Sequence, residues 1–382
     1  MTELISTPKH VISLLVAGVE IIGWESYSIS KPLVEQPDTF TMRLPFTREA
    51  WDLCQPDRLV QVRIDGVPVI TGFIDDSDVP EDSYVIEITG RGKIGRLIDE
   101  SAPTLNFSNL GILELITKLA SPWFTKVTFS GLRDRTVQRG RGRKARASGE
   151  PLLLNVRKKL GTIIEPGQTR WQAIKSLLDQ AGLIAWASGD GKELIISKPN
   201  YKQEVQFRFF RPSPGSRRVN DATVLAMGVK RSTGDRYSRI IVVGSGTGTD
   251  INYGAKVASR YGEAKNNDDT ADGEGIDFSV PKRLIVQRSV KSIDEAEELA
   301  EREMARRDAQ GYLLTVRAAG HGQLVAGAFT TLFANNLLAS CEHEPTGTVG
   351  TYAIVGCTFA QNRSESATTT MNLVCKGAEI AA

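Results

Sequence analysis

The most concentrated charge in the sequence is basic and lies between residues 133 and 159. Ten Lys and Arg residues stand there against Asp134 and Glu150, so the local charge is ten minus two, or +8, in a chain of net charge +2. Such a segment can bind nucleic-acid phosphates or an acidic protein surface, and a solvated loop is the structural alternative. No aromatic residues are interleaved to stack on bases, so we expect no sequence-specific nucleic-acid binding. The candidate electrostatic contact loop consists of Arg133, Arg135, Arg139, Arg141, Arg143, Lys144 and Arg146.

A second charged cluster is acidic, and paired carboxylates can serve as the acid and base of glycoside hydrolysis. It lies between predicted strands at 67–74 and 84–89, where a solvated hairpin tip accounts for it. A hydrolase activity is therefore an alternative without positive support, and we expect no enzyme. The members of the cluster are Asp75, Asp76, Asp78, Glu81 and Asp82.

Histidine and cysteine, which most often serve nucleophilic catalysis and zinc binding, are scarce. The chain has three histidines and four irregularly spaced cysteines. Cys341 and His343 share one short segment, but CxxC and HxxxH spacings are absent. We therefore expect an exposed hairpin turn before Pro345 rather than a metal site.

Two glycine-rich segments suggest phosphate binding, and neither has the required context. Residues 244–248 read GxGxG rather than GxGxxG, and no helical pattern follows to supply the N-terminus that binds a pyrophosphate. Residues 90–93 lack the rest of a phosphate loop and are expected to join a strand to a helical stretch. We expect no cofactor and no catalytic or metal-binding residues.

The elements that must position these residues are mainly strands. Apolar and polar residues alternate at 39–44 and 60–64 with the period of a half-buried strand, and Asp65-Gly66 suits a tight hairpin turn. With the strands at 67–74 and 84–89, they predict a small antiparallel sheet or barrel. Further strand patterns occur at 205–209, 239–243, 313–317, 324–333, 351–359 and 368–375, whereas 262–277 resembles a surface loop.

Three helices are predicted between the strands. Residues 109–120 carry apolar side chains at helical spacing. Thr169 and Gln172 form a capping box, in which each side chain satisfies a backbone N–H of the first turn. Ser292 and Glu295 repeat this pattern at the start of the third helix. Strands and helices do not alternate regularly, which disfavours a doubly wound parallel sheet.

The predicted fold class is mainly β with an α+β insert. The expected regions are a first β-barrel-like region at 1–97, an α+β module at 98–200 carrying the basic insertion 131–160, a second β-barrel-like region at 201–291, and a helix followed by C-terminal strands at 292–382.

The composition is that of a folded protein, with 41% hydrophobic and 24% charged residues among 382. The first residues lack the features of a signal peptide, and the longest uncharged run, 318–341, contains polar residues and glycines. We expect a soluble chain without membrane insertion. Sparse cysteines indicate folding in a reducing compartment.

Several short segments follow one another in an order that is specific as a set. They are Gly23-Trp24, Thr71-Gly-Phe-Ile-Asp75, 88–91 with 97–99, 109–122, 165–169 with the helix after it, 236–238, and 332–338. This order resembles the baseplate hub proteins of Mu-like contractile-tailed phages over nearly the whole chain. Phe333 and Asn335 replace the Trp and Pro usual in that family, and the basic insertion is an addition to it.

The resemblance implies a structural role. Hubs of this family are homotrimers whose subunits each carry two antiparallel β-barrels related to tail-tube proteins. Six barrels then form a pseudo-sixfold ring that joins the tail tube to the trimeric spike around a central channel. The implied partners are further copies of the chain, a spike protein, tail-tube or tube-terminal baseplate proteins, and the tape-measure protein.

The implied location is the tail baseplate of a virion assembled in the host cytoplasm. Three alternatives stay open at this point. They are a related contractile secretion-spike hub, a cell-wall hydrolase carried on a baseplate, and a single-stranded nucleic-acid binder acting through residues 133–159.

Overall fold

A computed structural model describes seventeen stretches of the chain, which fall into two compact units. Unit 1 comprises Met1–Asn200, Arg317–Leu337 and Gly356–Met371, and unit 2 comprises Tyr201–Val316, Leu338–Val355 and Asn372–Ala382. The described residues are 10–33, 37–81, 83–103, 112–130, 164, 167–198, 204–232, 237–244, 260–265, 283–288, 296–297, 299–301, 303–304, 307, 311–321, 337–362 and 365–375.

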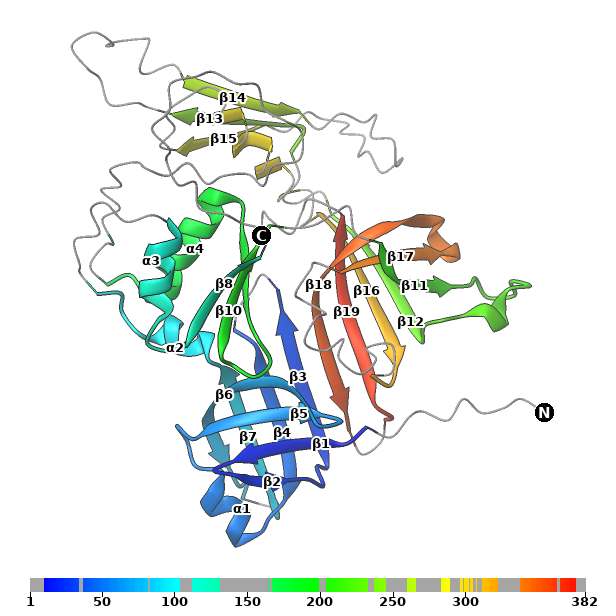
Figure 1. Ribbon diagram of the computed structural model, residues 1–382. Coiled ribbons are helices and arrows are strands. Elements are labelled where there is room, and N and C mark those ends of the chain that lie inside the picture. The colour runs from blue at the N-terminus through cyan, green and yellow to red at the C-terminus, as the bar shows by residue number, and fades with distance from the viewer. Residues whose placement is uncertain are drawn as a thin grey trace. The chain divides into compact units, whose positions relative to one another are not determined.

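Unit 1 contains an antiparallel sheet built from the N-terminal strands (Figure 1). Its order is β3-β4-β7-β6-β5-β1-β2, and β18 (Thr348–Gln361) pairs with β3 through residues of this unit. The predicted alternation is confirmed, because the side chains of Phe40, Met42 and Leu44 are all buried. The strands are β1 (Ile12–Val16), β2 (Val19–Ile21), β3 (Ser26–Pro32), β4 (Thr39–Pro45), β5 (Leu59–Ile64), β6 (Val67–Asp78) and β7 (Val85–Gly92), with short helices α1 (Arg48–Leu53) and α2 (Ile94–Asp99).

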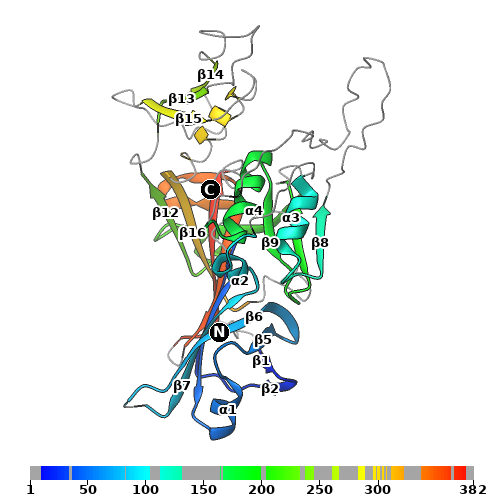
Figure 2. The same ribbon diagram turned by 90° about the vertical axis from the view of Figure 1, so that its left-hand side faces the viewer.

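Strand β6 is longer than predicted and forms a corner of this sheet (Figure 2). Its first half pairs with β5 and its second half with β7, and a bulge lies between Ile74 and Asp76. The bulge bends the strand while pairing with β7 continues. Asp75 and Asp78 therefore belong to the strand itself, which corrects the prediction that they lie on a hairpin tip.

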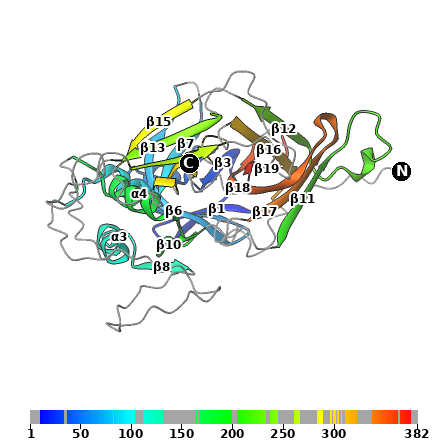
Figure 3. The same ribbon diagram turned by 90° about the horizontal axis from the view of Figure 1, so that it is seen from above.

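The predicted α+β module follows in unit 1. Its strand order is β8-β10-β9, with β9 antiparallel and β8 parallel to β10. Figure 3 shows α3 and α4 on the same side of these strands, and both helices contribute to one hydrophobic core. The elements are α3 (Ile112–Ala120), β8 (Lys126–Ser130), α4 (Arg170–Ala181), β9 (Ile184–Ala187) and β10 (Glu193–Ser197).

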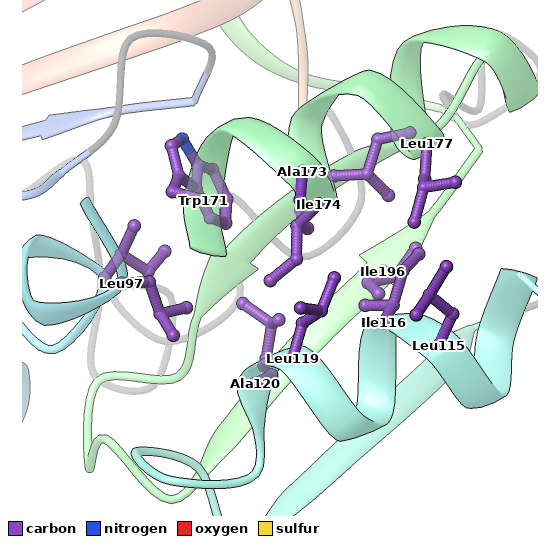
Figure 4. Packing of buried hydrophobic residues seen from close by; sticks show 14 of the residues in the cluster. Leu97, Leu115, Ile116, Leu119, Ala120, Trp171, Ala173, Ile174, Leu177 and Ile196 are labelled. Atoms are coloured by element: carbon purple, nitrogen blue, oxygen red, sulfur yellow. The ribbon is translucent and has the colours of Figure 1, made fainter. Parts of the chain in front are cut away.

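Apolar side chains spaced three or four residues apart on each helix fill the core of this module (Figure 4). Ile116 and Leu119 of α3 are fully buried, as is Ile174 of α4. The partners on the sheet include Leu194 and Ile196 of β10. The period of the apolar residues thus determines which face of each helix is covered.

Helix α4 begins and ends as the sequence predicts. The Thr169 hydroxyl accepts a hydrogen bond from the Gln172 amide at 3.2 Å, and the Gln172 side chain accepts one from the Thr169 amide at 3.0 Å. Gly182 ends the helix in the left-handed conformation, with φ of 61°. The local sequence therefore sets both ends of this helix.

We expect Thr169→Ala to lower the free energy of unfolding by about 1 kcal/mol, because it removes the hydroxyl that caps the helix. Chemical denaturation measures this change. Thr169→Ser is the matched control, because serine keeps the capping oxygen, and it should remain close to wild type. Equal loss in both variants would contradict the role of the cap.

Unit 2 contains a second group of strands, and three of them belong partly to unit 1 and partly to unit 2. The order is β12-β16-β19-β18-β17-β11, and β11 lies parallel to β17. Figure 3 shows these strands following a curve. The strands are β11 (Val205–Arg211), β12 (Ala226–Arg231), β16 (Tyr312–Ala319), β17 (Leu338–His343) and β19 (Thr368–Cys375), with 3-10 turns η1 (Val219–Asp221) and η2 (Glu344–Thr346).

The mainly β class is confirmed. Strand pairing in the described part of the chain forms one large sheet whose path is open from β12 to β2. Closure into two barrels and the predicted region boundaries stay predictions. No helix of the described residues is long and apolar enough to cross a membrane.

A separate three-stranded sheet of unit 2 has the order β14-β13-β15, with bounds Arg260–Lys265, Arg239–Gly244 and Arg283–Arg288. The prediction of a loop at 262–277 was wrong for residues 262–265, which belong to strand β14. Ala264 is buried with Ile240 and with Ala296 of the third predicted helix, and this long-range packing selects a strand. At Gly262, a Cβ atom would lie 2.1 Å from the backbone of Ala296, so glycine allows this close approach.

The third helix is confirmed where it is described, at 296–297, 299–301, 303–304 and 307. Ala300 and Met304 are buried, and Arg307 pairs with Glu303 one turn before it at 2.9 Å. Its predicted capping box at Ser292 lies outside the described residues, as does the predicted strand at 324–333.

Candidate functional site

The predicted electrostatic contact loop lies outside the described residues. Strand β8 ends at Ser130, directly before it. Its role in binding phosphates or an acidic surface therefore stays a prediction. The residues concerned are Arg133, Arg135, Arg139, Arg141, Arg143, Lys144 and Arg146.

The acidic cluster is divided by the structure into one paired carboxylate and several exposed ones. Asp75 accepts two hydrogen bonds from Arg91, at 2.7 Å from Nε and 3.0 Å from Nη2. The same guanidinium binds Asp99 of α2 at 2.8 Å and 3.0 Å. These bonds raise the pKa of Arg91, so the guanidinium stays positively charged. Asp76, Asp78 and Glu81 are exposed on β6 and the turn after it.

Arg91 therefore joins three segments that the sequence analysis singled out separately. Asp75 comes from 71–75, Arg91 from 88–91 and Asp99 from 97–99. Gly72 and Gly90, from the first two segments, lie where the backbones approach most closely. We interpret this arrangement as a structural corner, which we call the Arg91 corner (Gly72, Asp75, Gly90, Arg91 and Asp99). An arginine that binds two carboxylates holds the strands and the helix that carry them in position. Such an arrangement does not prepare either carboxylate to act as the proton donor of a glycoside hydrolase.

We expect Asp75→Asn to reduce stability by about 1 kcal/mol, because the partly exposed ion pair is screened by solvent and Arg91 keeps Asp99. Thermal denaturation measures this change, with Asp76→Asn as the matched control at an exposed neighbour. Neither variant nor wild type should clear peptidoglycan in a zymogram. Clearing by wild type that Asp75→Asn abolishes would instead identify a hydrolase.

Thr71, in the same segment, attaches the α+β module to the sheet of unit 1. Its hydroxyl donates a 2.8 Å hydrogen bond to the carbonyl of Gly189, in the turn between β9 and β10. A Cβ atom on Gly189 would lie 2.1 Å from the carbonyl oxygen of Pro68. Glycine at this turn therefore lets two backbones touch, which explains the module's position.

The segment with Cys341 and His343 is a buried strand, not the exposed hairpin turn that we predicted. Cys341 lies within β17 and is fully buried, and burial raises the pKa of its thiol to about 12. His343 is 8% exposed, and its Nδ1 lies 2.7 Å from the Thr346 hydroxyl. The turn begins only at Glu344, because β17 is paired on both sides. The described residues contain no group of three or more His, Cys, Asp or Glu side chains placed to hold a metal.

A buried ion pair joins β3 to the start of β4. Lys31 Nζ lies 3.1 Å from the Asp38 carboxylate and 2.7 Å from the carbonyl oxygen of Val69, and both charged side chains are buried. Burial raises the pKa of Asp38, against the opposing effect of Lys31. Each of the two charges therefore has a partner inside the protein, and we interpret the pair as structural rather than catalytic.

The sequence does not predict that His10 and His321 lie together, because they are 311 positions apart in the chain. Their ring centroids are 4.7 Å apart. The His321 backbone N–H donates to His10 Nε2 at 2.9 Å, and His10 Nδ1 lies 2.7 Å from Asp65, in the turn between β5 and β6. We call His10, Asp65, Tyr27, His321 and Thr369 the histidine network. No local pattern signals this contact.

The inner half of the network is enclosed. His321 Nε2 lies 2.9 Å from the Tyr27 hydroxyl, and His321 Nδ1 lies 3.0 Å from the Thr369 hydroxyl. Burial, followed by the neighbouring His10, lowers the pKa of His321 to about 4. Burial and then the charge of Asp65 raise the pKa of Tyr27. Both side chains are therefore uncharged at neutral pH.

Unit 2 has an open hollow of about 500 Å³ beside β11, β17 and η1. Arg218 stands at its edge, 4.0 Å from the ring centre of Phe210 and 2.5 Å from Glu342. Asp221 and Glu344 lie 3.8 Å and 3.7 Å from the same guanidinium. Arg218 is thus paired with carboxylates at this hollow, which indicates no particular ligand.

Together, the large β-sheet and the α+β module define the class as a mainly β protein with an α+β module. Comparison with solved structures supports this class. The chain resembles a tail protein of Neisseria meningitidis MC58 at 22% identity and a TM-score of 0.73, covering 97% of this chain and 98% of that one. It also resembles the 43 kDa tail protein of prophage MuSo2 from Shewanella oneidensis, at 18% identity, a TM-score of 0.68, and 97% and 99% coverage.

The sequence itself identifies the first region. Residues 11–92 match the family described as Mu phage baseplate assembly protein GpP-like, N-terminal. The predicted resemblance to Mu-like baseplate proteins is confirmed by this match and by the fold. A third similar structure is the c3393 protein of E. coli, described as a type VI secretion component that resembles the phage T4 tail proteins gp27 and gp5. It has 9% identity, a TM-score of 0.51, and coverage of 97% of this chain and 78% of that chain. The search of curated proteins found no match.

Proposed function

We propose that this chain is the structural hub of a phage tail baseplate, a homotrimer that joins the tail tube to the spike. The observation that carries the proposal is the likeness to two tail proteins, one of them from a prophage, over 97% of the chain, combined with the baseplate family match at 11–92. The hub would be a virion component assembled in the host cytoplasm, with no enzymatic activity of its own.

Hydrogen bonds outside the strand ladders support two tube-like barrels per chain. In unit 2, Thr223 covers the edge of β11 that does not pair with β17. The Thr223 amide donates to the Phe210 carbonyl, and the Thr223 hydroxyl accepts from the Phe210 amide and donates to the Arg208 carbonyl. Thr223 lies just before β12, the opposite end of the strand order. In unit 1, the histidine network links the start of β1 to β3. Both links shorten the gap that closure of a barrel requires.

Three copies with two barrels each would form a ring with pseudo-sixfold symmetry around a central channel. Such a ring matches a sixfold tube on one side and a threefold spike on the other. The tape-measure protein and DNA would pass through the channel. The basic loop at 133–146 would then contact an acidic neighbour or the channel contents.

Exposed apolar side chains at the sheet edge support association with further copies. Val19 of the edge strand β2 is 42% exposed, and Ile22 after it is 62% exposed. Among the described residues, β2 pairs only with β1. An edge strand with apolar side chains is unfavourable in an isolated subunit and favourable within an assembly.

The experiment that tests the hub is a mass measurement by light scattering over a concentration series. A trimer of the 41.7 kDa chain has a mass of about 125 kDa. The measurement is repeated with the neighbouring spike protein, and purified tails are analysed for the chain. A subunit that stays monomeric in both measurements and is absent from purified tails would refute the proposal.

The second candidate function is a hub of a contractile secretion apparatus. The likeness to the c3393 protein favours it, although the lower TM-score ranks it behind the phage tail. Mass spectrometry of the particle that contains the chain distinguishes the two functions, because a capsid accompanies a phage tail only.

A further inference from the structure

The two histidines of the histidine network occupy the contact between the chain before β1 and the end of β16. His10 directly precedes β1, and His321 follows the last residues of β16. Their partners come from β3, from the turn between β5 and β6, and from β19. One pair of imidazoles therefore ties together segments that are distant in the sequence.

The hydrogen-bond partners assign the proton on His10. Its Nε2 receives the backbone N–H of His321 at 2.9 Å, so this nitrogen must carry a lone pair. Its Nδ1 faces the Asp65 carboxylate at 2.7 Å, which only accepts, so this nitrogen carries the proton. His10 is thus neutral and held as the Nδ1–H tautomer. A second proton, on His10 Nε2, would place the ring N–H of His10 against the backbone N–H of His321.

The partners also assign the proton on His321. The Thr369 hydroxyl donates to the carbonyl of Gly320 at 2.8 Å, so it can only accept from His321 Nδ1–H. The Tyr27 hydroxyl lies 2.9 Å from His321 Nε2 and donates to Gln361 Oε1 at 3.3 Å. The contact between the two histidines is therefore complete only while His10 Nε2 carries no proton.

We propose that His10 and His321 form a proton-operated latch, which holds the start of β1 to the end of β16 at neutral pH and releases it in acid. Protonation of His10 Nε2 removes the acceptor for the His321 amide and leaves that donor buried without a partner. The cost of an unmet buried donor then opens the contact.

The charges around the pair support this behaviour. Asp65 is the carboxylate that faces it, and hydrogen bonds from His10 and Val11 outweigh burial and hold the pKa of Asp65 below its ordinary value. Tyr27 from β3, Gln361 and Phe359 from β18, and Thr369 from β19 are uncharged. One carboxylate thus faces two imidazoles, and a second positive charge would have no counter-charge in this set.

Hydrogen exchange followed by mass spectrometry tests the latch on the full chain. After correction for the intrinsic exchange rate, peptides covering residues 10–16 and 317–321 should exchange about tenfold faster at pH 5 than at pH 7, because one buried hydrogen bond is lost. His10→Gln keeps an acceptor near Nε2 but cannot be protonated, and it should abolish this acid-dependent increase. The matched control is His343→Gln in unit 2, which should leave the increase intact.

Nitrogen-15 labelling of histidine provides a measurement that needs no variant. Since the chain has only three histidines, two of the three ring signals at pH 7 should be those of the neutral Nδ1–H tautomer from His10 and His321. A cationic His10 at pH 7 would overturn the proposal. So would equal corrected exchange at pH 5 and pH 7 in wild type, or an increase that persists in His10→Gln.

Discussion

Gly72→Ala is expected to destabilise unit 1 by more than about 3 kcal/mol, or to prevent its folding. A Cβ atom at this position would lie 1.9 Å from the carbonyl oxygen of Arg91 and 2.7 Å from Gly92 Cα. Both atoms belong to the backbone of β7, so no side-chain rotation can relieve the contact. The strands would have to separate at the Arg91 corner, where β6 passes from β5 to β7.

The matched control is Gly228→Ala in β12, where a Cβ atom would meet nothing within 4 Å. This variant should stay within about 0.5 kcal/mol of wild type. Chemical denaturation and the yield of soluble protein measure both variants. A Gly72→Ala protein as stable as wild type would show that the corner is not as tightly packed as described.

The second large effect is a loss of stability in acid that depends on His321. The pKa of His321 is lowered to about 4 in the folded chain, from an ordinary value of 6.5. Between these two values the unfolded chain binds a proton that the folded chain does not, so stability falls as pH decreases from 6.5 to 4. The depressed pKa corresponds to about 3 kcal/mol.

The measurement compares His321→Gln with the parent chain by denaturation at several pH values. Both proteins also carry His343→Gln, because burial lowers the pKa of His343 as well and would add to the acid effect. His321→Gln should be less stable than its parent at pH 7, and the difference should shrink by about 3 kcal/mol on going to pH 4. A difference that is constant with pH would exclude a depressed pKa at His321.

The sequence by itself determined the local elements of this protein. The Thr169–Gln172 capping box, the apolar face of α3 and the alternation in β4 were all predicted correctly. Each depends on residues within a few positions of one another, where side-chain type and period act directly. The resemblance to Mu-like baseplate proteins was also visible, because its motifs are contiguous and follow one order.

The motifs did not reveal what they do in the fold. The physical role of Gly72 and Arg91 became clear only when β6 and β7 were paired, since the close contact and the ion pair to Asp75 join different segments. The same holds for β14, whose polar sequence resembles a loop until Ala264 packs against Ala296.

Only the tertiary structure decided the contact between His10 and His321. The two residues are separated by most of the chain, and each alone resembles an ordinary surface or core histidine. Their partners come from three further segments that no periodicity connects. Secondary structure follows from neighbouring residues, whereas buried hydrogen-bond networks depend on which distant strands the fold brings together.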